Sequence, residues 1–194
     1  SNGYNKHSRH TKELRGGRET ESPSLEIRML IEKNYLDKKT FKKVYDHLSG
    51  LNFPWYFNDY VLEPTDQFPD HFQFTHHFYR DGEWNSLANK WVVDPFINKL
   101  QPMSIVRIKA NLQPKYHKII EHGFHSDVVS DNVKITTAIF YVNSNNGYTL
   151  FENNKKVKSI ANSLCSFDSR ERHTGTTCTD EKCRIVINFN YIKL

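Results

Sequence analysis

The sequence predicts a mainly β protein, a sandwich or jelly roll with helices on one face. Two helical patterns stand in the first half of the chain, and the part after Met103 reads as short strands separated by turn-rich segments. The 13 Phe and 10 Tyr favour strands, because aromatic side chains pack well on a pleated surface. A chain of 194 residues with 37% hydrophobic residues is expected to form a core without disulfides.

Net charge and cysteine content further limit the kinds of protein to which the chain can belong. The formal net charge is +5, which allows a nucleic-acid partner without demanding one. Three cysteines are an odd number and argue against a secreted disulfide scaffold, so we expect Cys165, Cys178 and Cys183 to be free thiols in a reducing cytoplasm. No apolar run approaches the roughly 20 residues of a membrane span, so no membrane partner is expected.

Residues 1–24 differ in composition from the rest of the chain. They hold almost no apolar side chains and carry a slight excess of basic ones, so too little apolar surface is present to offset the chain entropy of folding. We expect a mobile basic arm at 1–24 and one domain at 25–194. The arm has either no role or a role in binding RNA or a partner.

The first half of the domain is predicted to hold two strands and two helical stretches. Asp37 is a suitable N-cap, and apolar residues follow at i, i+3, i+4 and i+7 from Phe41 up to a C-terminal Gly50. Ser86 is expected to cap the second helical stretch, which Asp94-Pro95 restarts because proline suits the first helical position. The two strands are predicted at 25–32 and 52–62.

The second half is predicted to be strands only. Alternation of apolar and polar residues, with turn-forming residues between the runs, marks five of them. They are expected at 106–112, 133–142, 148–151, 162–167 and 184–192.

Three residues of this half could hold a metal ion. On a strand, His125 and Asp127 would point to the same face, because side chains alternate. His173 follows a later predicted strand and could supply a third ligand. Two histidines and one carboxylate leave three octahedral positions open, the arrangement of non-haem Fe(II) oxygenases. Alone, His-x-Asp could equally be a solvent-exposed polar pair.

The alternation in the last strand places an arginine in a pocket. Arg184, Val186 and Asn188 would face one way, while the apolar residues between them and after them would face the core. A buried arginine needs an anion, and its planar fork suits a carboxylate, so a dicarboxylate co-substrate would fit between Arg184 and a metal. The alternative is that Arg184 pairs with an acidic side chain of the protein itself.

Other candidates carry less weight. Cys178 and Cys183, near His173, could suggest a zinc knuckle, but the spacing is poor and a fourth ligand is missing. The remaining histidines considered are expected to be surface or partly buried residues without a metal role: His76, His77, His117 and His122. The aromatic residues of this region are expected mainly in the core, with some at the mouth of a barrel: Trp55, Tyr56, Phe57, Phe72, Phe74, Phe78 and Tyr79.

Five motifs together resemble a known superfamily. In chain order they are His125-x-Asp127, Ala138-Ile-Phe-Tyr-Val-Asn143, Gly147-Tyr-Thr-Leu-Phe151, Phe167 before His173, and Arg184-Ile-Val-Ile-Asn188. From about Ser104 to its end the chain resembles 2-oxoglutarate- and Fe(II)-dependent dioxygenases, especially small viral and bacterial members of the prolyl 4-hydroxylase-like branch. The resemblance implies a double-stranded β-helix, that is, a jelly roll, with supporting helices.

The resemblance also implies roles for particular residues. His125, Asp127 and His173 match the iron ligands, Arg184 matches the residue that binds the distal carboxylate of 2-oxoglutarate, and Tyr141 matches a tyrosine that assists it. Tyr141 could equally be a plain core residue. Tyr116 and Asn111 fall where family members line the pocket beside the other end of 2-oxoglutarate. Two positions depart from common patterns: Tyr148 follows Gly147 where paired glycines are frequent, and Val186 replaces the Ser or Thr of the branches that modify amino acids and antibiotics.

The implied reaction is hydroxylation of a C–H bond with Fe(II), 2-oxoglutarate and O2, with ascorbate as a further cofactor to consider. The foremost substrate is a prolyl or other residue of a protein or peptide, and a small molecule stays open, whereas no nucleic-acid partner is expected. The resemblance to viral members leaves a virus-encoded protein in the host cytoplasm open. The competing hypotheses are a jelly-roll or barrel module that binds single-stranded nucleic acid and a cupin-like metal enzyme that does not use 2-oxoglutarate.

Overall fold

The computed structural model describes residues 28–63 and 70–193. The predicted arm at 1–24 and the domain boundary at residue 25 lie outside these residues. The helical segments are α1 (Lys38–Leu48), the 3₁₀-helix η1 (Leu87–Val92) and α2 (Asp94–Leu100). The strands are β1 (Leu30–Lys33), β2 (Tyr56–Asn58), β3 (Gln73–Arg80), β4 (Glu83–Trp84), β5 (Ser104–Pro114), β6 (Ile135–Tyr141), β7 (Tyr148–Phe151), β8 (Lys156–Lys158), β9 (Ser163–Asp168), β10 (His173–Gly175) and β11 (Cys183–Ile192).

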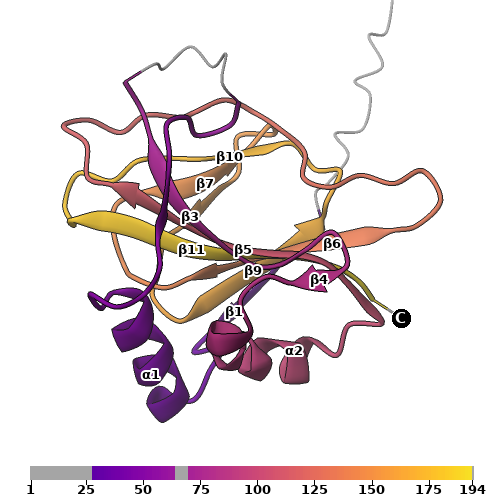
Figure 1. Ribbon diagram of the computed structural model, residues 1–194. Helices are drawn as coiled ribbons and strands as arrows, with labels where there is room; N and C mark the ends of the chain where they lie inside the picture. Colours follow the sequence, from indigo (N-terminus) through magenta and orange to yellow (C-terminus); the bar gives the residue numbers. More distant parts are fainter. Residues whose placement is uncertain (1–27, 64–69, 194) are drawn as a thin grey trace, which may run out of the picture.

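The strands form two antiparallel sheets. The larger has the order β1-β9-β6-β11-β5-β3-β2, with β4 paired to β3, and the smaller has the order β10-β7-β8. Two isolated bridges, Glu121 to Thr176 and His125 to His173, bring the segment before β6 alongside β10. Figure 1 shows the smaller sheet over one face of the larger one. The predicted jelly roll with supporting helices is confirmed.

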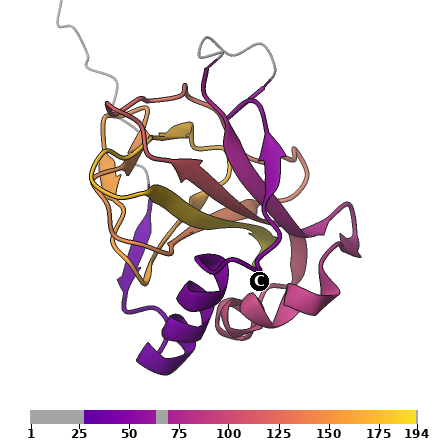
Figure 2. The same ribbon diagram turned by 60° about the vertical axis from the view of Figure 1, so that its left-hand side comes forward.

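The helices cover the opposite face of the large sheet, as Figures 1 and 2 show. Asp37 accepts hydrogen bonds from the backbone N–H groups of Lys39 and Thr40, so the predicted cap of α1 is confirmed. Residues from the helices and from the outward face of the sheet share one hydrophobic core. Its fully buried members include Val44, Leu48, Phe96, Phe140, Ile187 and Phe189.

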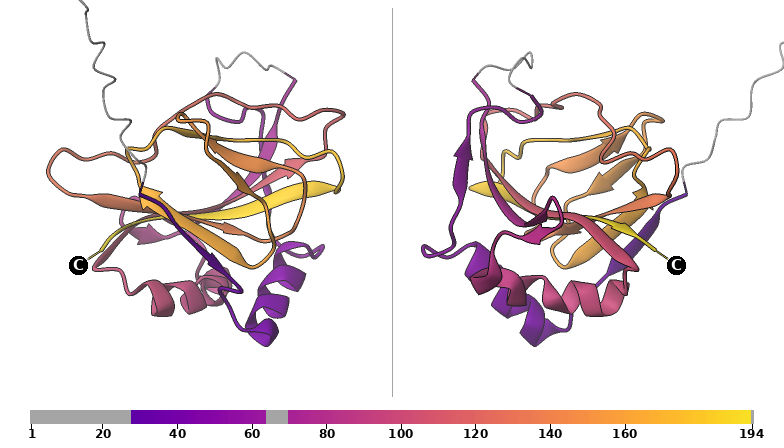
Figure 3. Two further views of the ribbon diagram at one scale, coloured as in Figure 1. Left: turned by 180° about the vertical axis from the view of Figure 1, so that it is seen from behind. Right: turned by 45° about the vertical axis from the view of Figure 1, so that its right-hand side comes forward.

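A second, smaller core lies between the two sheets. It joins Tyr141, Phe151 and Phe167, with partly buried Met29 packed against it. The large sheet therefore separates two apolar layers, and buried His173 packs against Phe151 and Phe167 of the inner one. Figure 3 shows in two further views that the helices and the smaller sheet lie on opposite sides of the large sheet. Among the residues that the structure describes, no helix has the length and apolar content for a membrane crossing.

Several predictions of local structure were wrong. The whole of β3 was missed, because its two adjacent histidines and three aromatic residues obscure any simple alternation. Ser86 makes no side-chain hydrogen bond to the helix backbone, and the stretch that it precedes is a 3₁₀-helix. The strand predicted at 52–62 is limited to β2. The predicted strand at 25–32 is seen only as β1, and its first residues lie outside the described part.

Burial also differs from some expectations. His76 and His122 are buried, not surface residues, and His76 contacts the carbonyl oxygen of Pro54 through Nδ1. Tyr56 and Phe57 are 63% and 64% exposed, because β2 is the edge strand of the large sheet. Phe78, by contrast, is fully buried in the helix-side core, as expected.

Candidate active site

A cavity of about 340 Å³ opens between the two sheets. Its floor is the inner face of β5 and β11, where every second residue points inward because side chains alternate along a strand. The predicted faces of β11 are confirmed: Arg184, Val186 and Asn188 line the cavity, and the intervening Ile185 and Ile187 are buried in the helix-side core. The matching residues of β5 are Arg107, Lys109, Asn111 and Gln113.

His125, Asp127 and His173 converge at one side of this cavity. One ligand atom from each lies within 4.8 Å of the other two. The reason differs from the prediction, because His125 and Asp127 lie in a loop and not on a strand. Backbone hydrogen bonds from His125 N to His173 O (3.0 Å), from His173 N to His125 O (2.9 Å) and from Asp127 N to Ser169 O (3.1 Å) fix the loop beside β10.

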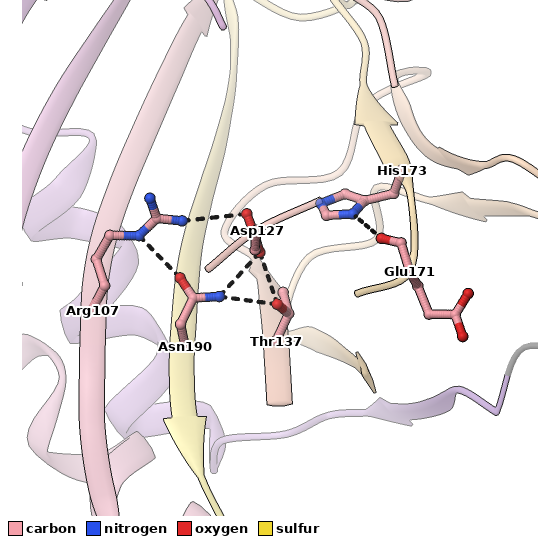
Figure 4. A network of polar contacts seen from close by, with 6 residues as sticks. All are labelled: Arg107, Asp127, Thr137, Glu171, His173 and Asn190. Atoms are coloured by element: carbon pink, nitrogen blue, oxygen red, sulfur yellow. Dashed lines mark hydrogen bonds and ion pairs between the residues drawn. The ribbon is translucent and has the colours of Figure 1, made fainter. Parts of the chain in front are cut away.

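Hydrogen bonds leave one ligand atom free on each of two side chains. His173 Nδ1 lies 2.9 Å from the Glu171 carbonyl oxygen, to which it donates, so Nε2 is the ring nitrogen left for a metal. Asp127 Oδ2 accepts from Thr137 (2.8 Å) and Asn190 (3.0 Å), whereas the one contact of Oδ1 within the described residues is with Arg107, at 3.3 Å. Figure 4 shows these contacts holding the carboxylate next to the imidazole. Both side chains are thus oriented before any metal binds.

The protonation states suit metal binding. Burial alone would raise the pKa of Asp127, but His173, Arg107 and the two hydrogen bonds lower it, so the carboxylate is ionised at neutral pH. Burial, together with His173, lowers the pKa of His125 to about 4, so its imidazole is neutral. Buried His125 Nδ1 has no hydrogen-bond partner among the described residues. Two imidazoles and one carboxylate form a donor set that fits Fe(II) and leaves coordination positions open.

Arg184 lies in the same cavity and has no acidic partner among the residues that the structure describes. It is only 4% exposed, and it donates from Nε to Ser159 Oγ at 2.9 Å and from Nη2 to Thr149 Oγ1 at 3.3 Å. No ion pair to Arg184 is formed within residues 28–63 and 70–193, so the alternative of pairing with the protein's own carboxylate is wrong there. Burial lowers the pKa of the guanidinium, because desolvation disfavours its charged form.

Two glycines make room for this arginine. A Cβ on Gly147 would lie 2.9 Å from Arg184 Cδ and 2.8 Å from the Thr177 carbonyl oxygen, and a Cβ on Gly175 would lie 3.3 Å from Arg184 Nη1. The Gly147 position therefore admits no side chain without movement of backbone or of Arg184. The single glycine of this chain at 147–148 already supplies that space.

The other three predicted pocket residues, Asn111, Tyr141 and Tyr116, differ in whether they line the cavity. Asn111 lines the cavity, and its Oδ1 is buried without a hydrogen-bond partner among the described residues. Tyr141 is fully buried and does not line the cavity, but its hydroxyl is 2.8 Å from Thr149 Oγ1, which also accepts from Arg184. Tyr116 does not line the cavity, and its ring packs edge-on against His71 with the centroids 4.5 Å apart.

Four further residues line the cavity or bind Arg184 and were not predicted as site residues: Thr149, Ser159, Arg107 and Lys109. Thr149 and Ser159 bind Arg184 from the smaller sheet and from the segment after β8, and no local motif marks them. Arg107 and Lys109 could have been found, because they share the polar face of the predicted strand 106–112 with Asn111.

The cysteines take no part in the site. Cys178 and Cys183 belong to no metal-ligand group in the described part of the chain, which agrees with the low weight given to a zinc knuckle. Cys165, Cys178 and Cys183 are all free thiols, as predicted.

No protein-family model and no curated protein matches the sequence. The structure, however, is similar to solved structures of one fold. A prolyl hydroxylase from Trichoplax adhaerens, in complex with a peptide fragment of the hypoxia inducible factor oxygen degradation domain, has a TM-score of 0.57 at 14% identity. The similarity covers 85% of this chain and 83% of that one.

Two further structures extend the comparison. The viral collagen prolyl hydroxylase of Paramecium bursaria Chlorella virus-1, in its 2-oxoglutarate complex, has a TM-score of 0.53 at 13% identity, over 86% of this chain and 96% of that one. HygX from Streptomyces hygroscopicus, with nickel, 2-oxoglutarate and hygromycin B bound, has a TM-score of 0.56 at 8% identity, over 86% and 83%. The chain thus has the fold of the 2-oxoglutarate- and Fe(II)-dependent oxygenases.

Proposed function

We propose that the protein is an Fe(II)- and 2-oxoglutarate-dependent dioxygenase that hydroxylates a C–H bond. One observation carries the proposal: the cavity that gathers His125, Asp127 and His173 also holds a buried arginine without an acidic partner among the described residues. Arg184 donates a hydrogen bond to Thr149, and Thr149 lies opposite Gly175 where β7 pairs with β10. Gly175 is two residues from His173 on β10. A small dicarboxylate can therefore reach both groups.

Each residue has a defined part in this proposal. His125, Asp127 and His173 would hold Fe(II), and Arg184 would bind the distal carboxylate of 2-oxoglutarate with its planar fork. Thr149 is held between Arg184 and Tyr141, so that Tyr141 acts on the carboxylate through Thr149. When bound, Fe(II) together with 2-oxoglutarate and O2 supplies the oxidising chemistry that no side chain offers. Ascorbate would keep the iron reduced.

The foremost substrate is a prolyl or other residue of a protein or peptide. The resemblance to the prolyl 4-hydroxylase-like branch supports it, as does the peptide bound by the similar Trichoplax enzyme. A free small molecule is the second candidate, since the similar HygX binds hygromycin B. The three free thiols support a reducing compartment such as the cytoplasm.

The alternatives make different predictions about the same cavity. A module that binds single-stranded nucleic acid needs no metal, and a cupin-like enzyme needs a metal without 2-oxoglutarate. Arg184 argues against the cupin-like enzyme, because a buried cation is costly unless an anion binds it, and a metal titration distinguishes the nucleic-acid module, which would bind no Fe(II).

The test is release of succinate from 2-oxoglutarate by the Fe(II)-loaded protein, screened against peptides and small molecules. We expect slow release without substrate and faster release with the right one, and we expect His173→Ala and Asp127→Ala to lose both. Asp46→Ala, which removes an exposed carboxylate from α1 on the far side of the large sheet, is the matched control and should retain activity. Release that is independent of Fe(II) would contradict the proposal.

A further inference from the structure

One positively charged residue of the cavity, Lys109, has no role in the function proposed above. Among the described residues, those with charged side chains that line the cavity are the cations Arg107, Lys109 and Arg184 and one carboxylate, Asp127. Arg184 is assigned to 2-oxoglutarate, and Arg107 pairs with Asp127 at 3.3 Å. The ammonium group of Lys109 makes no hydrogen bond and no ion pair with any residue in the described part of the chain.

The position of Lys109 is central. It lies on β5 opposite Asn188 of β11 and opposite His77 of β3, so it stands in the middle of the cavity floor. Lys109 lines the same cavity as the proposed metal ligands His125, Asp127 and His173. An anion bound by Lys109 would therefore be held beside the site of the reaction.

The surroundings of Lys109 disfavour its charge. Burial and the neighbouring Arg107 lower the pKa of Lys109 to about 8, although Asp127 acts in the opposite direction. Fe(II) and 2-oxoglutarate carry opposite charges of two units each, so their binding would leave the excess positive charge of the lining unchanged. The loaded cavity would still attract an anion.

Amide groups beside Lys109 also lack partners. Asn188 stands across from it and Asn111 two residues along β5, and each has a buried Oδ1 without a hydrogen-bond partner among the described residues. A carboxamide can turn to present its N–H₂ group instead. One ammonium and two carboxamides could then surround an oxyanion with hydrogen-bond donors.

We infer that the primary substrate carries an oxyanion, a carboxylate or a phosphate, that binds Lys109 between Asn111 and Asn188. This inference rests on the proposed function and narrows its substrate class. A neutral prolyl peptide would leave Lys109 uncompensated, whereas an acidic peptide or a small acid would neutralise it. Lys109 is thereby a specificity-determining residue.

The experiment uses the wild-type protein with Mn(II) as an inert metal and saturating 2-oxoglutarate. N-acetylglycine, its neutral amide and monomethyl phosphate are added in turn, and the Mn(II)-induced broadening of their methyl proton signals reports binding near the metal. We expect broadening of one or both anions and none of the amide. The anion that broadens more identifies the oxyanion as a carboxylate or a phosphate.

Variants assign the effect to Lys109. We expect Lys109→Met to weaken binding of the anion roughly tenfold or more, because a charge-assisted hydrogen bond is lost. Lys109→Arg should retain the preference for the anion. Lys158→Met, which removes an exposed lysine from β8, is the matched control and should behave as wild type.

The outcomes separate the two proposals. Equal broadening by the amide and the anions, or an unchanged preference in Lys109→Met, would overturn the inference and leave the dioxygenase proposal standing. Loss of 2-oxoglutarate binding in Lys109→Met, with anion binding intact, would overturn it as well and assign Lys109 to the co-substrate instead. A wild-type protein that binds neither Mn(II) nor 2-oxoglutarate would contradict the proposed function itself.

Discussion

Asn190 on β11 donates a hydrogen bond of 3.0 Å to Asp127 Oδ2, across 63 residues of sequence. The same Nδ2 atom lies 2.9 Å from Thr137 Oγ1, and Thr137 in turn donates to Asp127 Oδ2. Two strands of the large sheet thus fix a carboxylate that stands on a loop. The rigid sheet, and not the loop, orients this proposed metal ligand.

We predict that Asn190→Ala weakens metal binding. Asp127 would lose one of the two hydrogen bonds to Oδ2, and losses of this kind typically lower metal affinity about 10- to 100-fold. Titration with Mn(II), followed by electron paramagnetic resonance, measures the change. Thr137→Val should act in the same direction, whereas Thr137→Ser retains the hydroxyl and should stay near wild type. Unchanged affinity in both Asn190→Ala and Thr137→Val would show that the network does not support the ligand.

Arg184→Ala is expected to weaken 2-oxoglutarate binding far more than metal binding. The variant leaves the distal carboxylate in a buried place without its partner, which costs about 3–5 kcal/mol, or roughly a hundredfold to several thousandfold in affinity. Titration of Mn(II) and then 2-oxoglutarate into both proteins gives the two constants. If 2-oxoglutarate still binds within a few-fold of wild type, the assignment of Arg184 is wrong and the cupin-like alternative gains support.

Gly147→Ala is expected to destabilise the protein and to displace Arg184. The new Cβ would lie 2.8 Å from Asn145 Oδ1, 2.8 Å from Thr177 O and 2.9 Å from Arg184 Cδ. We expect a fall in Tm together with weaker 2-oxoglutarate binding. Gly82→Ala is the control, because a Cβ there meets nothing within 4 Å and only the positive φ of +84° opposes it. That variant should lose some stability and keep its 2-oxoglutarate affinity.

His77 is expected to make the folding stability fall as the pH is lowered. Burial, with Lys109 and Arg80 nearby, lowers the pKa of His77 to about 4 in the folded protein, against about 6.5 in the unfolded chain. Between these values the unfolded state binds the extra proton, so this contribution to stability is complete above about pH 6.5 and decreases toward pH 4. Because the ring is only half-buried, we expect a loss of no more than about 2 kcal/mol.

Urea denaturation at about pH 7 and about pH 5, on either side of the ordinary histidine pKa, tests this dependence. His77→Gln should reduce the difference in the free energy of unfolding between the two pH values. His117→Gln, at an exposed position, should leave the difference as in wild type. An equally steep dependence in His77→Gln would assign the effect to other groups.

The sequence predicted an element best where the local residue pattern alone determines how that element packs in the fold. The alternation from Arg184 to Tyr191 predicted both faces of β11, because a strand in a two-layered fold has one neighbour on each side. The helix α1 was equally clear from Asp37 and the apolar spacing that follows it. In both cases, residues close together in sequence carry the whole signal.

Other features depend on partners far along the chain. His125 and Asp127 share a side of the cavity because their backbone N–H groups donate hydrogen bonds to the carbonyl oxygens of His173 and Ser169. The alternation of side chains along a strand does not predict these hydrogen bonds. Thr149 matters only because it lies between Tyr141 and Arg184. The alternation on β5 is visible in the sequence, but the unpaired state of its lysine is a property of the folded cavity.

The separation of two apolar layers by the large sheet has a consequence for protein engineering. Stability depends mainly on residues such as Ile187 and Phe189 that face the helices, while Lys109, Asn111 and Asn188 face the cavity. Substitutions at alternate positions of the same strand are therefore expected to act nearly independently. A combinatorial library confined to those three inward positions could change substrate preference while retaining a folded scaffold.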